Sequence, residues 1–162
     1  MTETRVGYGY DVHKIGAGKP LMLGGVEIEG EEGLVGHSDA DVLLHALSDA
    51  LLGAAGLGDI GEHFPSSDPR FRGADSAEMA RHLMGIVTDR GYRVANADVT
   101  IVTQAPPLHA YKERIRGSIA GILLVEPERV NVKAKTKEGL DAVGEGRAME
   151  AHAVVLITGE DA

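Results

Sequence analysis

The stretch GYGYDVH, residues 7–13, alternates glycine with β-forming residues, and this alternation predicts a strand. Residues two apart in a strand point to the same face, so Asp11 and His13 share one face and Val12 takes the other. Two such side chains can bind one metal ion. They can equally form the polar face of an edge strand, and this stretch alone leaves both interpretations open.

A second stretch, GHSDADVLLHALSDALLG at residues 36–53, predicts a helix that runs from Ser38 to about Gly56. Ser38 is a good N-cap, and Asp41 follows three residues later as a short variant of the capping box. The expected helix also carries an apolar stripe, made of Leu43, Leu47, Ala50, Leu51 and Ala54.

The other face of this helix holds Asp41, His45 and Asp49, each four residues apart. They form either a solvated face of acid–histidine pairs or a metal ligand, His45, that Asp41 and Asp49 orient through hydrogen bonds. Together with Asp11 and His13, His45 completes a set of three nitrogen and oxygen ligands. Such a set with a free fourth position is typical of catalytic zinc sites.

Composition narrows the class of protein. The 162 residues are 43% hydrophobic, which suits one domain, residues 1–162, with its own core. A net charge of −9 argues against nucleic-acid partners and anionic membrane surfaces. The absence of cysteine leaves histidine and carboxylates as metal ligands. Because there is neither an apolar signal core in MTETRVGYG nor a membrane-length apolar run, we expect a soluble, unprocessed, cytoplasmic protein.

The remaining elements predict an α/β fold, specifically an α+β sandwich. KPLMLGGVEIEG, residues 19–30, indicates two short strands that turn at Gly24–Gly25. Further helices are expected from Ser76 to Arg90 and from about Leu108 to Leu124, and further strands at 92–104, 129–136 and 147–159. This intermixed order favours a four- to five-stranded mixed sheet with about three helices on one face, in a ferredoxin-like arrangement.

Three segments suit the binding of a phosphate or a nucleotide. His37 and Ser38 sit at the expected helix N-terminus, where backbone N–H groups favour an anion, unless Ser38 is only a cap. Thr136 and Glu138 share a face at a strand end and can hold a phosphate and a hard cation, or they belong to a charged surface turn. The proline-rich loop TQAPPLHAY, residues 103–111, can present a backbone edge to a nucleobase.

Four segments together resemble the 2-C-methyl-D-erythritol 2,4-cyclodiphosphate synthases. They are GYGYDVHKI (7–15), LVGHSDADVLLHALSDALLGAAGLGDIGEHFPSSDP (34–69), ADVTIVTQAP (97–106) and VNVKAKTKEGL (130–140), and the resemblance runs from about Arg5 to Thr158. It implies a homotrimeric enzyme of the non-mevalonate isoprenoid pathway with active sites between neighbouring subunits. The substrate would be 4-diphosphocytidyl-2-C-methyl-D-erythritol 2-phosphate, whose 2-phosphate attacks the β-phosphorus and expels CMP.

The same resemblance implies roles for individual residues. Asp11, His13 and His45 would bind one zinc ion per chain, and Glu138 would lie near a second divalent cation, magnesium or manganese. His37 and Thr136 would align the reacting groups and stabilise the transition state. The substrate-binding residues would be Asp11, His13, His37, Ser38, Asp59, Gly61, Phe64, Pro65, Ser66, Ser67, Asp68, Thr103, Ala105, Pro106, Leu108, His109, Ala134, Lys135, Thr136, Glu138 and Ala142.

Two departures from the family pattern stand out. Pro107 replaces a lysine that often follows QAP, with Lys112 and Lys135 as possible substitutes. The segment AVGEG is about two residues shorter than usual, with Ala142 in place of an aromatic residue and no arginine that matches the one in the family pattern. Because that arginine faces the cavity that would bind isoprenoid diphosphates, regulation by them is not expected. Two other functions share these residues: a zinc-dependent phosphoester hydrolase that uses an activated water, and a non-catalytic trimer that binds cytidine nucleotides.

Overall fold

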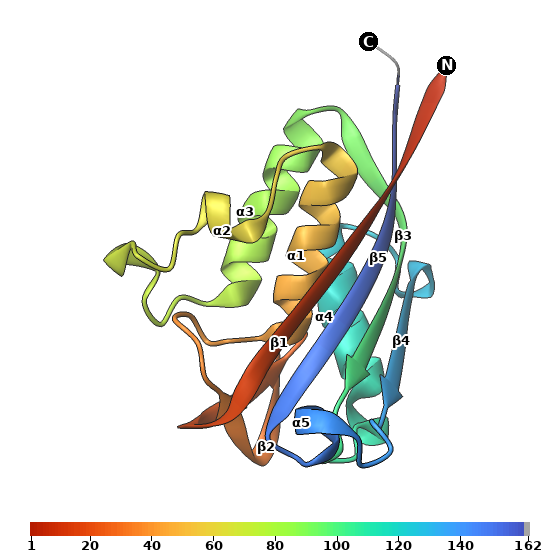
Figure 1. Ribbon diagram of the computed structural model, residues 1–162. Coiled ribbons are helices and arrows are strands. Elements are labelled where there is room, and N and C mark those ends of the chain that lie inside the picture. Colours follow the sequence, from red (N-terminus) through yellow and green to blue (C-terminus); the bar gives the residue numbers. More distant parts are fainter. Residues whose placement is uncertain (161–162) are drawn as a thin grey trace.

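A computed structural model describes residues 1–160, and the last two residues of the predicted domain 1–162 lie outside this part. One five-stranded sheet has the order β2-β1-β5-β3-β4 (Figure 1). Its strands are β1 (Thr2–Leu23), β2 (Val26–Leu34), β3 (Tyr92–Val102), β4 (Val130–Lys135) and β5 (Ala148–Glu160). β3 and β4 are parallel and the other neighbours are antiparallel, so the sheet is mixed, as predicted.

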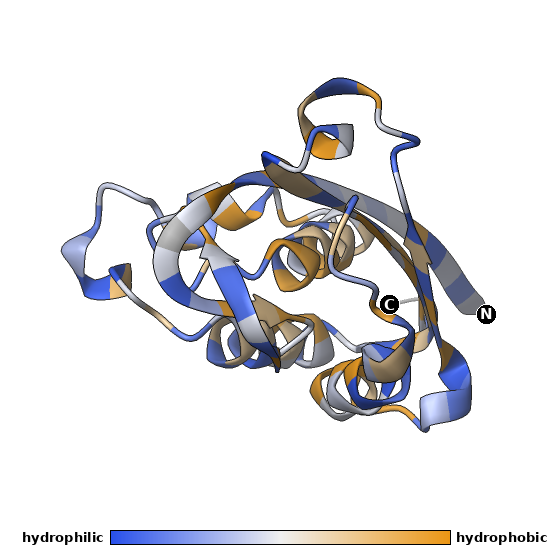
Figure 2. Ribbon diagram, turned by 90° about the horizontal axis from the view of Figure 1, so that it is seen from below, coloured by the Kyte–Doolittle hydropathy of each residue, from blue (hydrophilic) through white to orange (hydrophobic). Residues whose placement is uncertain are grey.

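Three long helices lie on one side of the sheet, namely α1 (Val42–Ala55), α3 (Ser76–Asp89) and α4 (Lys112–Leu123) (Figure 1). Two short helices, α2 (Ile60–His63) and α5 (Asp141–Gly144), lie in connecting segments. Figure 2 shows hydrophobic residues on the helices and strands where the two layers meet. The predicted α/β fold is confirmed. None of the helices in residues 1–160 is long and apolar enough to cross a membrane.

The ferredoxin-like arrangement is wrong. That motif orders its elements β-α-β-β-α-β, whereas here α4 lies between β3 and β4, and β5 follows β4. The parallel pairing of β3 with β4 requires a crossover connection, which α4 supplies. β5 then returns to pair with both β1 and β3, in the middle of the sheet.

The alternation in GYGYDVH brings α1 directly onto β1. A Cβ atom at Gly7 would lie 1.8 Å from the carbonyl oxygen of Ala50, and one at Gly9 would lie 1.8 Å from that of Ala46. No side chain therefore fits between this part of the strand and the helix backbone. The intervening residues, Tyr8 among them, are exposed on the opposite face of the sheet.

The first helix begins later than the sequence predicts. Its N-cap is Asp41, not Ser38, and the Asp41 carboxylate accepts a hydrogen bond from the Leu44 N–H. The same carboxylate accepts the N–H groups of Gly24 and Gly25, in the predicted turn between β1 and β2. Burial raises the pKa of Asp41, whereas these three donors act to lower it. Asp41 therefore joins the helix start to the hairpin, and Ser38 lies in the preceding bend.

The other predicted boundaries differ by a few residues. α3 begins at Ser76 as expected, with Asp75 as its N-cap. α4 begins at Lys112 instead of Leu108, because residues 109–111 form a separate 3-10 turn. The glycine-rich segment that follows α1 contains the short helix α2.

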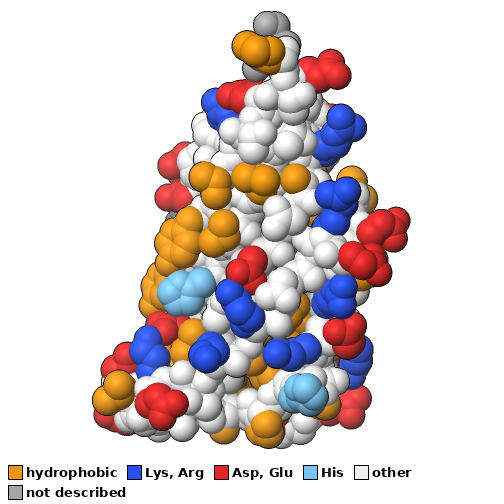
Figure 3. Space-filling model, turned by 90° about the vertical axis from the view of Figure 1, so that its right-hand side faces the viewer, with side chains coloured by type: hydrophobic (Ala, Val, Ile, Leu, Met, Phe, Trp, Pro, Cys, Tyr) orange, Lys and Arg blue, Asp and Glu red, His pale blue; other side chains and the backbone are white. Residues whose placement is uncertain are grey.

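The sheet face away from the long helices carries exposed hydrophobic side chains. They come from alternate residues of β1 and from β5: Val6, Tyr8, Tyr10, Val12 and Val154. Figure 3 shows hydrophobic side chains gathered in bands on one side of the molecule, among charged groups. We call these five residues the open-face patch.

Candidate functional site

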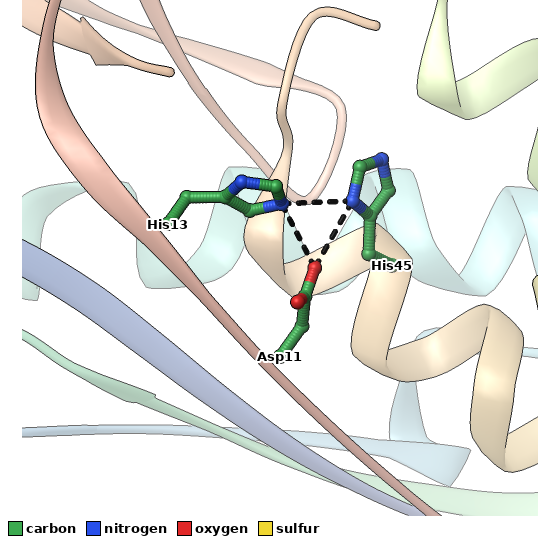
Figure 4. Close-up of side chains that lie close together, drawn as sticks. All are labelled: Asp11, His13 and His45. Carbon is green, nitrogen blue, oxygen red and sulfur yellow. Dashed lines mark hydrogen bonds and ion pairs between the residues drawn. The ribbon is translucent and has the colours of Figure 1, made fainter. Parts of the chain in front are cut away.

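Asp11, His13 and His45 meet at one point (Figure 4). The Asp11 Oδ2 atom lies 2.9 Å from His13 Nε2 and 3.0 Å from His45 Nδ1, and the two nitrogens are 3.1 Å apart. Strand β1 supplies the first two residues and helix α1 supplies the third. Strand β1 and helix α1 therefore meet at the predicted metal site.

Local packing explains this convergence. Asp11 and His13 continue the alternation of Gly7 and Gly9, so all four positions face the helices. His45 directly precedes Ala46, whose carbonyl oxygen lies against Gly9. The two glycines thus let α1 approach closely enough for its histidine to reach the acid on β1.

The donor triangle suits a small divalent cation. Ligand bonds of 2.0–2.1 Å in a tetrahedral zinc site place neighbouring ligand atoms about 3.3 Å apart. The observed separations of 2.9 to 3.1 Å need to widen by only a few tenths of an ångström. Two imidazoles and one carboxylate, all partly shielded from solvent, match a zinc site that has three protein ligands and one free position.

Burial and hydrogen bonds shift the pKa values of two of these residues. Burial alone would raise the pKa of Asp11, but hydrogen bonds with His13 and His45 outweigh it and lower this pKa well below its usual range. Burial lowers the pKa of His13, and the stronger influence of Asp11 raises it. The Nδ1–H of His13 donates to the Val35 carbonyl at 2.9 Å, which leaves Nε2 facing the other two ligands.

The predicted partners of His45 are wrong. The Asp41 carboxylate accepts hydrogen bonds from the hairpin turn, as described above, and an Asp49 oxygen accepts the Ile60 N–H at 2.8 Å. His45 Nε2 instead lies 3.0 Å from Ser76 Oγ and 3.1 Å from Ser38 Oγ. Spacing along one helix cannot reveal Ser76, because it begins a different helix 31 residues away.

A cavity of about 200 Å³ opens beside the donor triangle. Its lining includes seven residues from the predicted set, namely His13, His37, Ser38, His45, Gly61, Phe64 and Ser66, together with Ile60, Phe71 and Met79. The Nε2–H of His37 donates to the Asp68 carbonyl at 3.1 Å. This bond fixes the orientation of the imidazole, which lines the cavity together with Ser38.

Other residues of the predicted set surround this cavity. Asp59 is the N-cap of α2 and accepts the Glu62 N–H, so its carboxylate is partly committed to the helix. Ser67 lies with His37 in an adjoining depression. The Asp68 carboxylate forms an ion pair with Arg70, and Pro65 is partly exposed between Phe64 and Ser66.

A second cavity, of about 330 Å³, lies at the ends of β3 and β4. It is lined by Thr103, Gln104, Pro106, Pro107, Leu108, His109, Lys112, Ala134, Lys135 and Thr136, most of them predicted. The Ala105 carbonyl accepts the Thr103 hydroxyl, and the Ala105–Pro106 bond is cis. Lys112 and Lys135 both border the cavity, so cationic groups remain near Pro107.

The segment after β4 differs from the prediction. Thr136 and Glu138 do not share a strand face, because β4 ends at Lys135 and Glu138 adopts a left-handed conformation. The Glu138 N–H donates weakly to Thr136 Oγ1, at 3.4 Å. Lys137, between them, forms an ion pair with Glu150 on β5. Neither Glu138 nor Ala142 is among the residues that line the second cavity.

The two cavities do not join within one chain. A row of paired residues crosses the sheet from Asp11 through Ala151 and Ile101 to Ala134. Three strand spacings along this row amount to about 14 Å, and Ala151 and Ile101 are completely buried. The predicted catalytic pair is therefore divided, since His37 lines the first cavity and Thr136 lines the second.

Comparisons with known proteins agree with this geometry. A sequence model of the YgbB family matches residues 4–158. The 2-C-methyl-D-erythritol 2,4-cyclodiphosphate synthase of Pseudomonas aeruginosa (strain UCBPP-PA14) is 56% identical over 153 residues, which cover 94% of this chain and 98% of that protein. The synthase of Geobacter sulfurreducens (strain ATCC 51573 / DSM 12127 / PCA) is 54% identical over the same shares of both proteins.

Two solved structures extend the likeness to three dimensions. IspF of Plasmodium falciparum, solved as a CDP complex, has a TM-score of 0.85 and 32% identity, and the match covers 98% of this chain and 97% of that one. Bifunctional IspDF of Campylobacter jejuni has a TM-score of 0.95 and 40% identity over 99% of this chain. The chain spans only 44% of that longer protein.

Proposed function

Because this chain belongs to the YgbB family over residues 4–158, we propose that it is a 2-C-methyl-D-erythritol 2,4-cyclodiphosphate synthase. It would convert 4-diphosphocytidyl-2-C-methyl-D-erythritol 2-phosphate into the cyclic diphosphate and CMP, in the non-mevalonate pathway of isoprenoid biosynthesis. The observation that carries this proposal is the Asp11–His13–His45 triangle beside a cavity, in a chain 56% identical to a synthase of that name.

The reaction suits a site without a protein nucleophile. An oxygen of the 2-phosphate attacks the β-phosphorus, a new P–O bond forms, and the bond from the β-phosphorus to the bridging oxygen breaks, so that CMP leaves with the electron pair. Phosphoryl transfer of this kind depends on positioning and on neutralisation of charge. A zinc ion held by Asp11, His13 and His45 would supply positive charge next to a phosphate oxygen.

The two cavities would divide the substrate between them. The first, with His37, Ser38, Gly61, Phe64 and Ser66, would hold the methylerythritol part, with Asp59 near its hydroxyl groups. The second would hold the cytidine, with the backbone of residues 103–109 against the base and Lys135 and Thr136 at the phosphates. His37 and Thr136 would then act from opposite sides of the diphosphate.

This division supports an assembly of several copies, and the resemblance to the family makes a homotrimer the assembly we propose. One substrate has to reach both cavities, and buried core residues separate them within a chain. The first cavity of one subunit would therefore face the second cavity of a neighbour, and the open-face patch would be covered by the other subunits. Each subunit would be a single domain that spans residues 1–162.

A second divalent cation, magnesium or manganese, would bind between the diphosphate and Glu138. Glu138 is exposed and lies next to Thr136. Within residues 1–160, Asp11, His13 and His45 are the one cluster of three or more histidine or carboxylate side chains close enough together to bind a single metal ion. Substrate oxygens and water would therefore supply most ligands of the second cation, as magnesium commonly prefers.

The remaining partners follow from the substrate. The protein would bind a small cytidine-diphosphate-linked molecule and other copies of itself, with neither nucleic acid nor membrane, in keeping with its net charge of −9. We place it in the cytoplasm, where such a nucleotide substrate would be made.

The test combines product analysis with metal analysis. The wild-type protein, supplied with authentic substrate and Mg²⁺, should release CMP and a cyclic product without oxygen from labelled water. His45→Ala should lose zinc and activity together, while His82→Ala, an exposed histidine on α3, should keep one zinc per chain.

Two results would contradict the proposal. Labelled oxygen in a linear product would identify a hydrolase, and tight cytidine-nucleotide binding without turnover would identify a binding protein. Full activity of His45→Ala would overturn the assignment of the metal ligands.

A further inference from the structure

We propose that Asp39 and Ser76 position His45 as a metal ligand, by holding a proton on its Nε2 atom and so directing Nδ1 toward Asp11 and His13. This inference rests on the metal site proposed above. Neither residue belongs to the set that the sequence predicts, and neither lines the cavity beside the donor triangle.

The contacts form a continuous chain from the ligand to a carboxylate. His45 Nε2 lies 3.0 Å from Ser76 Oγ, and the Ser76 hydroxyl makes a short hydrogen bond to Asp39 Oδ1. The Ser76 side chain is almost completely buried, with 1% of its surface exposed. The contact between His45 and Ser76 therefore joins α1 to the first residue of α3.

The direction of these hydrogen bonds follows from the acceptor at the end. An ionised carboxylate only accepts, so the Ser76 hydroxyl must donate to Asp39. Its single proton is then used, and Ser76 Oγ can only accept from His45. When Nδ1 is the atom that binds the metal, the Nε2 atom of His45 therefore carries the proton and donates it to Ser76 Oγ.

Asp39 is held in place from both sides. Its Oδ1 atom also accepts the Asp41 N–H at 3.2 Å, and its Oδ2 atom accepts the Ser76 N–H at 3.1 Å. Both oxygens thus face backbone N–H donors, so a reversed chain would have to break one of these contacts. Ser38 Oγ, which accepts the Ala40 N–H, gives His45 Nε2 a second contact at 3.1 Å.

This arrangement matches what a metal ligand needs. Metal-bound histidines usually donate their other ring N–H to a protein acceptor, which orients the ring and raises its basicity. His13 does this through the Val35 carbonyl. The Asp39–Ser76 chain would do the same for His45, and Asp41 and Asp49, on its own helix, do not.

Ser76→Ala is the first test, because it removes the hydroxyl and little else. Protein stripped of metal by a chelator is titrated with Zn²⁺ in competition with a chromophoric chelator. Zinc affinity should fall roughly 10- to 100-fold, whereas Ser48→Ala should keep wild-type affinity. Ser48 is an equally buried serine on α1 that makes no hydrogen bond to His45.

Asp39→Asn tests the direction of the chain. An asparagine must place its NH₂ group against one of the two N–H donors, or turn it toward Ser76 and reverse the Ser76 hydroxyl. The reversed hydroxyl would donate to Nε2 and push the proton of His45 onto Nδ1. Zinc affinity should fall to the Ser76→Ala level, while Asp75→Asn, which loses the same charge one residue before Ser76, should retain it.

Nitrogen-15 NMR of labelled histidine supplies a readout that does not depend on activity. In the zinc-loaded wild type, the His45 Nε2–H should exchange slowly with solvent because Ser76 Oγ accepts it, and this protection should be lost in Ser76→Ala. A rapidly exchanging Nε2–H in the zinc-loaded wild type would overturn the inference. So would folded Ser76→Ala and Asp39→Asn variants that bind zinc within twofold of the wild type. A wild type that binds no zinc would overturn the proposed metal site itself.

Discussion

Asp49 on α1 forms a hydrogen bond to α2 and not to His45. It is half-buried, and its Oδ1 atom accepts the Ile60 N–H at the start of α2. Burial raises the pKa of Asp49, the Ile60 N–H lowers it, and the nearby charges of Asp59 and Asp11 raise it again. The residue therefore joins α1 to the segment that covers the cavity, and its ionised form is disfavoured in the folded protein.

This shift predicts a pH-dependent gain for Asp49→Asn in metal-free protein. A raised folded-state pKa means that the stabilising contribution of Asp49 is full below the unfolded pKa of about 3.9 and is lost as the pH rises through the folded pKa. Asparagine keeps an acceptor for Ile60 and carries no charge. Urea unfolding should therefore show a more stable variant at neutral pH, with the gain fading in acid.

Asp98→Asn serves as a control of opposite sign. Burial acts to raise the pKa of Asp98, but Lys133 and Asn131 outweigh it and lower this pKa. Its contribution is therefore present above the unfolded pKa, so the variant should lose stability at neutral pH and approach the wild type in acid. If the free energies of unfolding of the two variants, relative to the wild type, changed with pH in the same direction, the opposite pKa shifts of Asp49 and Asp98 would be contradicted.

At the scale of elements, the contact between β1 and α1 decides whether the metal site can form. Gly7 and Gly9 lie against the carbonyl oxygens of Ala50 and Ala46, with no space for a Cβ atom. Asp11 and His13 belong to the same strand, and His45 belongs to the same helix. Any change that separates these two elements must also open the donor triangle.

Gly9→Ala should therefore affect stability and metal binding together. The added methyl group would push α1 away, at a cost of about 1–3 kcal/mol in the free energy of unfolding, and zinc affinity should fall. Gly85→Ala is a matched control on α3, where a Cβ atom meets nothing within 4 Å. That variant should be more stable by about 0.5–1 kcal/mol, with unchanged zinc affinity in the same chelator competition. A Gly9→Ala protein with wild-type stability would show that α1 can move away from β1 without a loss of stability.

At the scale of the whole molecule, the open-face patch and the separated cavities point to the same assembly. Val6, Tyr8 and Val154 are 66%, 59% and 43% exposed, which leaves a hydrophobic surface on the central strands. Large exposed hydrophobic patches are typical of interaction surfaces. The proposed trimer would cover it and would bring His37 of one subunit near Thr136 of another.

Val154→Glu should dissociate the trimer, because it places a charge at the centre of the patch. Sedimentation velocity should show monomers at concentrations where the wild type forms the proposed trimer, and CMP release should be lost with the composite site. Leu124→Glu is the control, since Leu124 is 74% exposed at the end of α4 and lies outside the patch. A Val154→Glu monomer with full activity would show that one chain suffices.

Sequence patterns within single strands, helices and turns determined several features of the fold and of the candidate site. Alternation in GYGYDVH placed Asp11 and His13 on one face, and helical periodicity placed His45 on α1, because side-chain direction follows from strand and helix geometry. The hairpin turn at Gly24–Gly25 follows from local backbone preferences in the same way.

Contacts between distant segments were decided only by the tertiary structure. Asp41 became the N-cap because the hairpin turn supplied two more donors, and Ser76 replaced Asp41 and Asp49 as the partner of His45 because α3 packs beside α1. His37 and Thr136 came to line different cavities because β5 returned between β1 and β3. Hydrogen bonds and burial depend on which segments meet in space, and residue spacing along one element carries no record of those meetings.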